Sequence, residues 1–319
     1  MNFQDLKKIE NPDFYIDVAF GRAKKKAELV RQKRFKDRLT KSKEIEKTKV
    51  SVIGDSLASK LLDVLKQFPS LEHLPPFYHE LAKATLEYAD VRKSLGGVNW
   101  AVTRINEFTK KYSSKIQKCN DLQKINQYRR EYYGRISSLV KQIKKELQII
   151  DNARKIMRQY PTIKTSLKTV SIAGFPNIGK TTLLSKLTGS TPDIQAYAFT
   201  TQGINVAYIK KDKTKIQVLD TPGTLNRFDR MNSIEKIAYI ALKHCTDMII
   251  YIIDLTEPYP LKQQEALLRK IKETKKPLII YLSKSDILDK DIINKGKKKY
   301  NAITDIRLLK KEIIQKLGG

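Results

Sequence analysis

The sequence predicts an α/β protein in two parts: an antiparallel helical bundle over residues 1–165, and a domain with a mostly parallel sheet over residues 166–319. Three observations predict this fold. Apolar residues recur at helical spacing in the first part, and short β-rich segments alternate with helical segments in the second. A phosphate-loop motif, GFPNIGKTT, lies where the first of these strands meets the first helix. A chain of 319 residues is long enough for two domains.

The first part carries two apolar stripes with a period of 3.6 residues. One stripe lies between Val98 and Cys119, and the other lies between Leu122 and Ile150, with Gly134 as a candidate bend. The second stripe is long enough for a helix of about eight turns. Two segments with helix-breaking residues, FPSLEHLPPF and LGGVN, are expected to separate the helices. The pattern therefore predicts long helices packed side by side.

The second part contains segments typical of buried strands. They read KTVSIAG, INVAYI, KIQVLD, MIIYIID and PLIIYLS, and helical segments separate most of them. Strands that alternate with helices form a mostly parallel sheet flanked by those helices. Such folds bind phosphate where a strand leads into a helix N-terminus. The phosphate-loop motif lies at that position.

The loop at residues 174–182 fits the pattern G-x-x-x-x-G-K-[ST]. In this pattern the loop N–H groups and the lysine surround nucleotide phosphates, and the Ser/Thr hydroxyl reaches Mg²⁺. Lys180 and Thr181 are the lysine and the hydroxyl residue here. The residues predicted to contact the phosphates are Gly174, Phe175, Pro176, Asn177, Ile178, Gly179, Lys180, Thr181 and Thr182.

Two downstream segments supply the groups that a nucleotide switch needs. DTPG, at residues 220–223, places Asp220 to hold Mg²⁺ through water and the Gly223 N–H to meet a γ-phosphate. YAFTT offers Thr201, whose hydroxyl would join Mg²⁺ when the γ-phosphate is present. Thr181, Thr201 and Asp220 are therefore the predicted Mg²⁺ residues.

The base is predicted from SKSD, at residues 283–286. Asp286 can accept hydrogen bonds from guanine N1 and N2, and Lys284 can lie along the base, whereas adenine offers no such donor pair. The usual pattern is Asn-Lys-x-Asp, so Ser283 in place of Asn weakens or changes one contact. In addition, YNAITDIRLL resembles the loop whose backbone N–H, here that of Ala302, points at the guanine carbonyl, with Asn301 where Ser is common. These motifs predict a Ras-like P-loop GTPase domain that binds GTP and GDP.

Intrinsic hydrolysis is expected to be slow. DTPG is followed by Thr224 and Leu225, where Ras-like enzymes place a glutamine that orients the attacking water. Another group must compensate for the missing glutamine. Asn177 is a candidate ligand for K⁺, and the charge of that ion would stabilise the transition state. The alternative is that Asn177 only hydrogen-bonds within the loop. The predicted catalytic residues are Lys180, Thr201, Gly223 and Asn177.

Charge indicates a polyanionic partner. The chain has 63 Lys and Arg against 34 Asp and Glu, a formal net charge of +29, and both parts are basic. Nucleic acid fits this charge better than an anionic membrane surface does. Residues 22–49 hold 13 basic and 4 acidic side chains, which favours RNA contact over a merely solvated helix face. The predicted RNA-contacting residues are Arg22, Lys24, Lys25, Lys26, Arg31, Lys33, Arg34, Lys36 and Arg38.

Cysteine usage and hydropathy favour a cytoplasmic location. Cys119 and Cys245 are too few and too far apart for a disulfide framework, which fits a reducing compartment. The longest apolar run, MIIYII, is well short of the roughly 20 residues of a spanning helix. The N-terminal residues lack an apolar signal core. We therefore expect no membrane attachment.

Three segments together carry a family resemblance: FPSLEHLPPFYHELA, GFPNIGKTTLLSKLTGSTPDIQAYAFTT and LDTPG. With them the chain resembles, over nearly its whole length, the nucleolar GTP-binding protein 1 family of Obg-related GTPases. The resemblance implies a GTPase that acts in maturation of the large ribosomal subunit. Charge alone does not assign the RNA surface, because both parts are basic, but the dense basic stretch at residues 22–49 leads us to expect that the helical part docks on rRNA. Eukaryotic members carry a long C-terminal extension that this sequence does not show. Because the chain is also rich in lysine and isoleucine, it looks like an archaeal member, which would be cytoplasmic. We expect it to be monomeric off the ribosomal particle.

The sequence leaves two other functions open. The first is a nucleotide-gated binding or sensing module with negligible turnover. The second is a membrane-associated signalling GTPase, which is disfavoured because the sequence shows no anchor or lipidation motif.

Overall fold

The computed structural model describes residues 2–189, 193–195, 204–211, 214–220 and 233–318. Its contacts divide the chain into two compact units. The helical unit comprises residues 5–73 and 86–158, and the sheet unit comprises residues 1–4, 74–85 and 159–319. The expected domains, residues 1–165 and 166–319, stay predictions, and the contacts differ from them by placing residues 1–4, 74–85 and 159–165 in the sheet unit.

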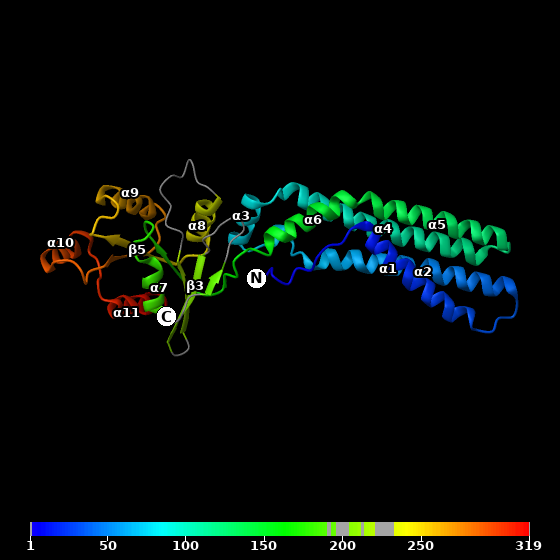
Figure 1. The fold of residues 1–319 in the computed structure, drawn as a ribbon, viewed down its shortest axis with the longest axis horizontal. Coiled ribbons are helices and arrows are strands. Elements are labelled where there is room, and N and C mark those ends of the chain that lie inside the picture. The colour runs from blue at the N-terminus through cyan, green and yellow to red at the C-terminus, as the bar shows by residue number, and fades with distance from the viewer. Residues whose placement is uncertain (1, 190–192, 196–203, 212–213, 221–232, 319) are drawn as a thin grey trace. The chain divides into compact units, whose positions relative to one another are not determined.

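The helical unit is built from long helices that run antiparallel to their neighbours, as Figure 1 shows. The contacting pairs include α1 with α2, α2 with α4, and α4 with both α5 and α6. The predicted helical bundle is confirmed for this unit. Its helices are α1 (Pro12–Arg31), α2 (Arg38–Gln67), α4 (Tyr88–Lys118), α5 (Leu122–Gln142) and α6 (Lys144–Met157).

Helix α1 shows how local sequence sets both the start of a helix and its buried face. Asn11 caps the helix by accepting a hydrogen bond from the Phe14 N–H, and Pro12 occupies the first position, where its missing N–H costs nothing. Tyr15, Ala19, Ala23 and Ala27, spaced four residues apart, are buried. Because three of these residues are alanines, α1 can approach α2 closely along this face, and its charged side chains remain on the other side.

Two sequence expectations about helix breaks are wrong. Helix α4 continues through LGGVN, because the buried stripe of Val91, Ser94, Val98 and Ala101 outweighs the roughly 1 kcal/mol that each glycine costs in a helix. The second stripe, expected to form one helix of about eight turns, is divided at Ile143, where φ is −87° and ψ is 20°, while α5 continues through Gly134. The break predicted at FPSLEHLPPF is confirmed, because α2 ends before it and a short 3₁₀ turn, Leu71–His73, follows.

The helix α3 (Pro76–Thr85) belongs to the sheet unit although helices of the other unit flank it in sequence. The buried Tyr78 hydroxyl donates to Pro161 O over 2.8 Å and accepts from the Ile163 N–H over 2.9 Å. Helix α3 also contacts α8 (Ser233–His244). These contacts hold α3 against the segment that leads into the sheet.

Within the described residues, six strands form one sheet in the order β2-β3-β4-β1-β5-β6. Strands β4, β1, β5 and β6 are parallel, whereas β3 pairs antiparallel with both β2 and β4. The mostly parallel sheet and its five predicted strands are confirmed, and the short β2 was missed. The strands are β1 (Thr169–Ala173), β2 (Asp193–Gln195), β3 (Ile204–Lys211), β4 (Thr214–Asp220), β5 (Met248–Asp254) and β6 (Leu278–Ser283).

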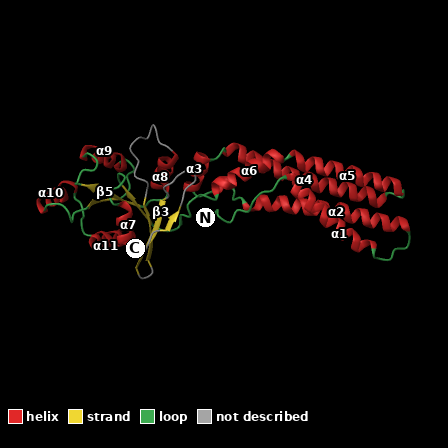
Figure 2. Cartoon of the chain, in the orientation of Figure 1, coloured by secondary structure: helices red, strands yellow, loops and turns green. Residues whose placement is uncertain are grey.

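Helices flank the sheet, and Figure 2 distinguishes them from the strands by colour. Figure 1 shows α7 and α11 below the sheet and α8 and α9 above it. The helices of this unit not yet bounded are α7 (Lys180–Thr188), α9 (Leu261–Lys272), α10 (Lys290–Tyr300) and α11 (Ile306–Leu317).

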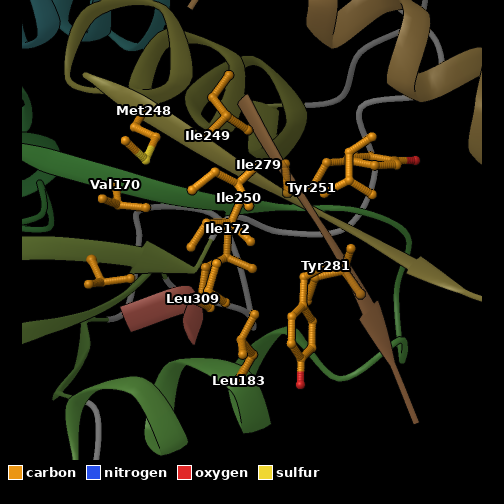
Figure 3. Packing of buried hydrophobic residues seen from close by; sticks show 14 of the residues in the cluster. Val170, Ile172, Leu183, Met248, Ile249, Ile250, Tyr251, Ile279, Tyr281 and Leu309 are labelled. Carbon is orange, nitrogen blue, oxygen red and sulfur yellow. The ribbon is translucent and has the colours of Figure 1, made fainter. Parts of the chain in front are cut away.

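The core of the sheet unit lies between these layers. Figure 3 shows Ile172 of β1 and Ile250 of β5 among side chains from the flanking helices, including Leu183 of α7 and Leu309 of α11. Every residue of β1 and β5 is buried, as expected for central parallel strands. Each fully buried Ile or Leu contributes roughly 1.5–3 kcal/mol. The central strands are therefore firmly held, and their carboxyl ends form a rigid base for the loops that follow them.

Candidate nucleotide-binding site

The phosphate loop joins the carboxyl end of β1 to the N-terminus of α7. Gly174 has φ +150°, and a Cβ there would lie 2.4 Å from Ile178 Cδ1 and 3.1 Å from Ile252 O. Gly179, with φ +93°, occupies the N-cap of α7, and no side chain caps that helix. The first N–H groups of α7 therefore face the loop, in the arrangement by which helix N-termini bind phosphate. The two glycines of the motif are required by this backbone path.

The nine predicted loop residues do not contribute in the same way. The side chains of Phe175 and Ile178 are buried in the core, and the Phe175 ring centroid lies 4.7 Å from that of Tyr259. These two residues can offer a phosphate only their backbone groups. Asn177 is exposed, with φ +58°, and Pro176 lies beside it in the loop. Thr182 is exposed in the first turn of α7.

Lys180 lies across the loop. Its ammonium donates to Phe175 O over 2.6 Å, and the residue is only 8% exposed. Burial lowers the pKa of Lys180, and the nearby carboxylate of Asp220 partly opposes this shift. A buried ammonium is costly unless an anion compensates it. The loop thus holds a positive charge where the motif places the nucleotide phosphates.

Thr181, in the first turn of α7, meets Asp220 at the carboxyl end of β4, as a metal site would require. The Thr181 hydroxyl donates to Asp220 Oδ2 over 2.6 Å. Asp220 Oδ1 is buried and has no hydrogen-bond partner among the residues that the structure describes. Burying a carboxylate oxygen without a partner is unfavourable, and a cation would remove that cost. This pair of oxygen ligands fits Mg²⁺.

Asn205 belongs to the same cluster, and sequence reasoning missed it. Its side-chain N–H donates to Asp220 Oδ2 over 3.0 Å. The β3–β4 pairing places Asn205 directly opposite Asp220. Recognising it from the sequence would have required the register of this hairpin.

The base-recognition loop follows β6. Ser283 is buried, and its hydroxyl is 3.5 Å from Ile253 O, which is at the limit of a hydrogen bond. A Cβ on Gly179 would lie 3.9 Å from Ser283 Cβ, so the base loop and the phosphate loop are neighbours. Asp286 is exposed, two residues beyond Lys284. The structure thus brings together the two loops that the sequence assigned to one nucleotide.

The last predicted contact differs from expectation. Asn301 has φ +49° and ends α10, and the Ala302 N–H, expected to point at the guanine carbonyl, donates to Lys297 O over 3.1 Å. Ile303 joins the edge of β6 through hydrogen bonds with Ile280 and Leu282. The loop therefore lies beside the base-recognition loop, but its Ala302 N–H closes α10 in this structure.

A buried network next to the base loop was also missed. Lys284 Nζ lies 2.7 Å from Asp254 Oδ2, and Asp254, at the end of β5, is fully buried. Gln264 of α9, also fully buried, brackets Asp254 by accepting from its N–H and donating to its C=O. Neither residue belongs to a recognised motif, so only their positions after folding reveal them.

The remaining predicted residues lie elsewhere. Thr201 and Gly223, and also Thr224 and Leu225, are outside the described residues. The nine predicted RNA-contacting residues lie in the helical unit, between Arg22 and Arg38, and all are exposed. No described helix is long and apolar enough to cross a membrane.

Two family models match the chain. The model described as the NOG1 N-terminal helical domain matches residues 3–164. The model described as a 50S ribosome-binding GTPase matches residues 169–284. The second match covers the phosphate loop, Asp220 and Lys284. This part of the chain is a GTPase domain.

Similar proteins occur in several organisms. An uncharacterized protein of Methanocaldococcus jannaschii is 37% identical over 294 residues, covering 91% of this chain and 82% of that protein. The nucleolar GTP-binding protein 1 of Arabidopsis thaliana is 29% identical over 303 residues, and that of Saccharomyces cerevisiae is 27% identical over 293 residues. These alignments cover 93% and 90% of this chain but 45% of each of those two proteins.

Among solved structures, that of a putative nucleolar GTP-binding protein 1 from Plasmodium falciparum is 29% identical. The alignment covers 46% of this chain and 78% of the solved chain, with a TM-score of 0.35.

The family model for the helical part spans half of the chain, and the GTPase model follows it directly. The chain belongs to the nucleolar GTP-binding protein 1 family.

Proposed function

We propose that this protein is a GTP-hydrolysing assembly factor of the large ribosomal subunit. The protein would dock on rRNA through its helical unit, and the bound nucleotide would time its attachment or release. The observation that carries the proposal is the pairing of a GTPase site with nine exposed basic residues on α1, the following loop and the start of α2. The description of the matched GTPase model, as a 50S ribosome-binding GTPase, supports the same partner. The M. jannaschii relative supports an archaeal, and hence cytoplasmic, member. Off the particle, the protein would be monomeric.

The site chemistry follows from the described groups. Thr181 and Asp220 would hold Mg²⁺, with Asn205 fixing the Asp220 carboxylate. When bound, the ion would neutralise charge that develops on the phosphate oxygens. Lys180 and the N-terminus of α7 would hold the β- and γ-phosphates, and Thr201 and the Gly223 N–H would report whether the γ-phosphate is present.

The K⁺ role of Asn177 stays a prediction. The hydrolysis rate in K⁺ should differ from the rate in Na⁺ at equal ionic strength, and equal rates would reject this role.

RNA docking predicts a steep dependence of affinity on salt. If the basic residues contact phosphates, the logarithm of affinity should fall with the logarithm of salt concentration, with a slope of about −0.7 to −0.9 per contact. The combined variant R31Q/K33Q/R34Q/R38Q should bind large-subunit rRNA more weakly and flatten this slope. Filter binding or fluorescence anisotropy over a range of KCl concentrations measures both effects.

The control removes the same charge from the other unit. Four exposed lysines of α10 serve this purpose: Lys290, Lys295, Lys297 and Lys298. The variant K290Q/K295Q/K297Q/K298Q should keep the slope of the parent. A parent slope near zero, or equal slopes for the two variants, would argue that the basic residues on α1 and α2 are only a solvated helix face.

A further inference from the structure

The carboxylate of Asp254 is enclosed on every side that the structure describes. Asp254 is 0% exposed and ends β5, in register opposite Ser283 of β6. Its Oδ1 accepts from the Thr256 N–H over 2.9 Å and from the Thr256 hydroxyl over 2.6 Å. Among the described residues its Oδ2 has no hydrogen-bond partner, but it lies 2.7 Å from Lys284 Nζ and so forms an ion pair. A buried carboxylate is tolerated only when it is paired in this way.

The backbone of Asp254 is held as firmly as its side chain. Gln264 Oε1 accepts from the Asp254 N–H over 3.0 Å, and Gln264 Nε2 donates to Asp254 O over 2.9 Å and to Tyr259 O over 2.8 Å. The Tyr251 hydroxyl donates to Gln264 O over 2.7 Å. The carboxylate is therefore a fixed point at the end of a central strand, and the partner that it can orient is Lys284.

Lys284 occupies a backbone conformation that needs such support. Its φ is +53°, in the left-handed region, where the Cβ of a lysine is crowded by the backbone. Its carbonyl accepts from the Ile287 N–H over 3.3 Å, which closes the turn that carries Asp286. Fixing Lys284 thus fixes the turn on which the guanine-recognition carboxylate is presented.

The residue before Lys284 cannot supply this restraint. Ser283 has a short side chain, and its hydroxyl reaches only Ile253 O, at 3.5 Å. The asparagine of the usual pattern has a longer side chain with both a donor and an acceptor, so it can reach further than a serine hydroxyl. With Ser283 in its place, the ion pair between Asp254 and Lys284 is the strong side-chain restraint that the structure shows for this loop.

We infer that Asp254 is a specificity-determining positioning residue, which acts through Lys284 to hold Asp286 where it can accept from guanine N1 and N2. The inference rests on the assignment of Lys284 and Asp286 to the base. It follows from the juxtaposition of a fully buried carboxylate, a strained lysine and a short Ser283, rather than from any one of them. The role of Asp254 requires no contact between its own carboxylate and the nucleotide.

The test compares GDP with inosine diphosphate, which lacks the 2-amino group, by titration calorimetry on the full chain. Asp254→Asn preserves the shape of the side chain and can still accept from Thr256, but it loses the ion pair. GDP affinity should fall about tenfold, and the ratio of GDP to inosine diphosphate affinity should narrow toward one, because a displaced Asp286 no longer reads the amino group. A purely structural weakening would lower both affinities equally and leave that ratio unchanged.

Two further variants separate the inference from a folding defect. Lys284→Met keeps the aliphatic stem along the base and removes only the charged end, so it should narrow the ratio as Asp254→Asn does. The double variant D254N/K284M should bind GDP no more weakly than the weaker single variant, because both changes break one contact. Asp247→Asn is the matched control, since Asp247 pairs with Lys168 and the Thr169 N–H at the opposite end of β5. It should retain the ratio of the parent.

The outcomes distinguish the inference from its premise. A parent that binds GDP and inosine diphosphate equally would reject the assignment of Asp286. If the parent prefers GDP to inosine diphosphate, but D254N and K284M keep the parent's ratio of the two affinities, the role of Asp254 would be rejected. The assignment of Asp286 would stand. Additive losses in the double variant would also overturn it, because they would mean that the two residues act independently.

Discussion

Lys180→Ala is expected to weaken GTP binding by about 10²-fold to several thousand-fold. Lys180 is 8% exposed and lies across the phosphate loop, with its ammonium 2.6 Å from Phe175 O. Removing one partner of a buried charge pair costs about 3–5 kcal/mol, and each 1.4 kcal/mol is a tenfold change in affinity. Calorimetric titration with GTP in the presence of Mg²⁺ measures the loss.

The same helix offers a control for this prediction. Lys186 is exposed on α7, beyond the first turn, so Lys186→Ala removes the same side chain without touching the loop. Its GTP affinity should match that of the parent. If Lys180→Ala folded and bound GTP as the parent does, the loop at residues 174–182 would not be the nucleotide site.

The second large effect is a change of base preference. Asp286→Asn should lower GDP affinity by about 10²-fold, because two charge-assisted hydrogen bonds to N1 and N2 are lost. The same variant should bind xanthosine diphosphate better than the parent does, since the Asn amide donates where the xanthine carbonyl accepts. Competition between the two nucleotides, followed with a fluorescent GDP analogue, measures both affinities.

Asp289 provides the comparison for Asp286. It is an exposed carboxylate three residues further along, at the N-cap of α10, and its side chain makes no capping hydrogen bond. Asp289→Asn should leave the preference for GDP unchanged. Equal affinities of the parent for GDP and ADP would contradict the guanine assignment itself.

The features predicted correctly from the sequence are those that short, local patterns determine. The motifs at residues 174–182 and 283–286 were expected at strand ends, and the structure places them at the carboxyl ends of β1 and β6. The apolar periodicity likewise predicted the helices that contain Val98 and Ile125. In each case, neighbours within a few residues carry the signal.

The features that were missed depend on contacts between distant segments. Asn205 meets Asp220 only through the β3–β4 register, and Asp254 meets Lys284 across 30 residues. The LGGVN segment misled because its glycines favour a break locally, whereas the buried stripe of α4 continues through them. Packing of the buried stripe keeps α4 continuous through its glycines, and such packing cannot be predicted from one segment alone.

Binding to the large-subunit precursor in each nucleotide state tests the central claim most directly. The full chain, loaded with GDP or with a non-hydrolysable GTP analogue, would be sedimented through a sucrose gradient with ribosomal precursor particles at physiological salt. We predict that it migrates with the large-subunit precursor in one nucleotide state and is released in the other, and that R31Q/K33Q/R34Q/R38Q abolishes the association while K290Q/K295Q/K297Q/K298Q retains it. A parent chain that stays at the top of the gradient in both states, or that sediments equally with small-subunit particles, would contradict the proposal.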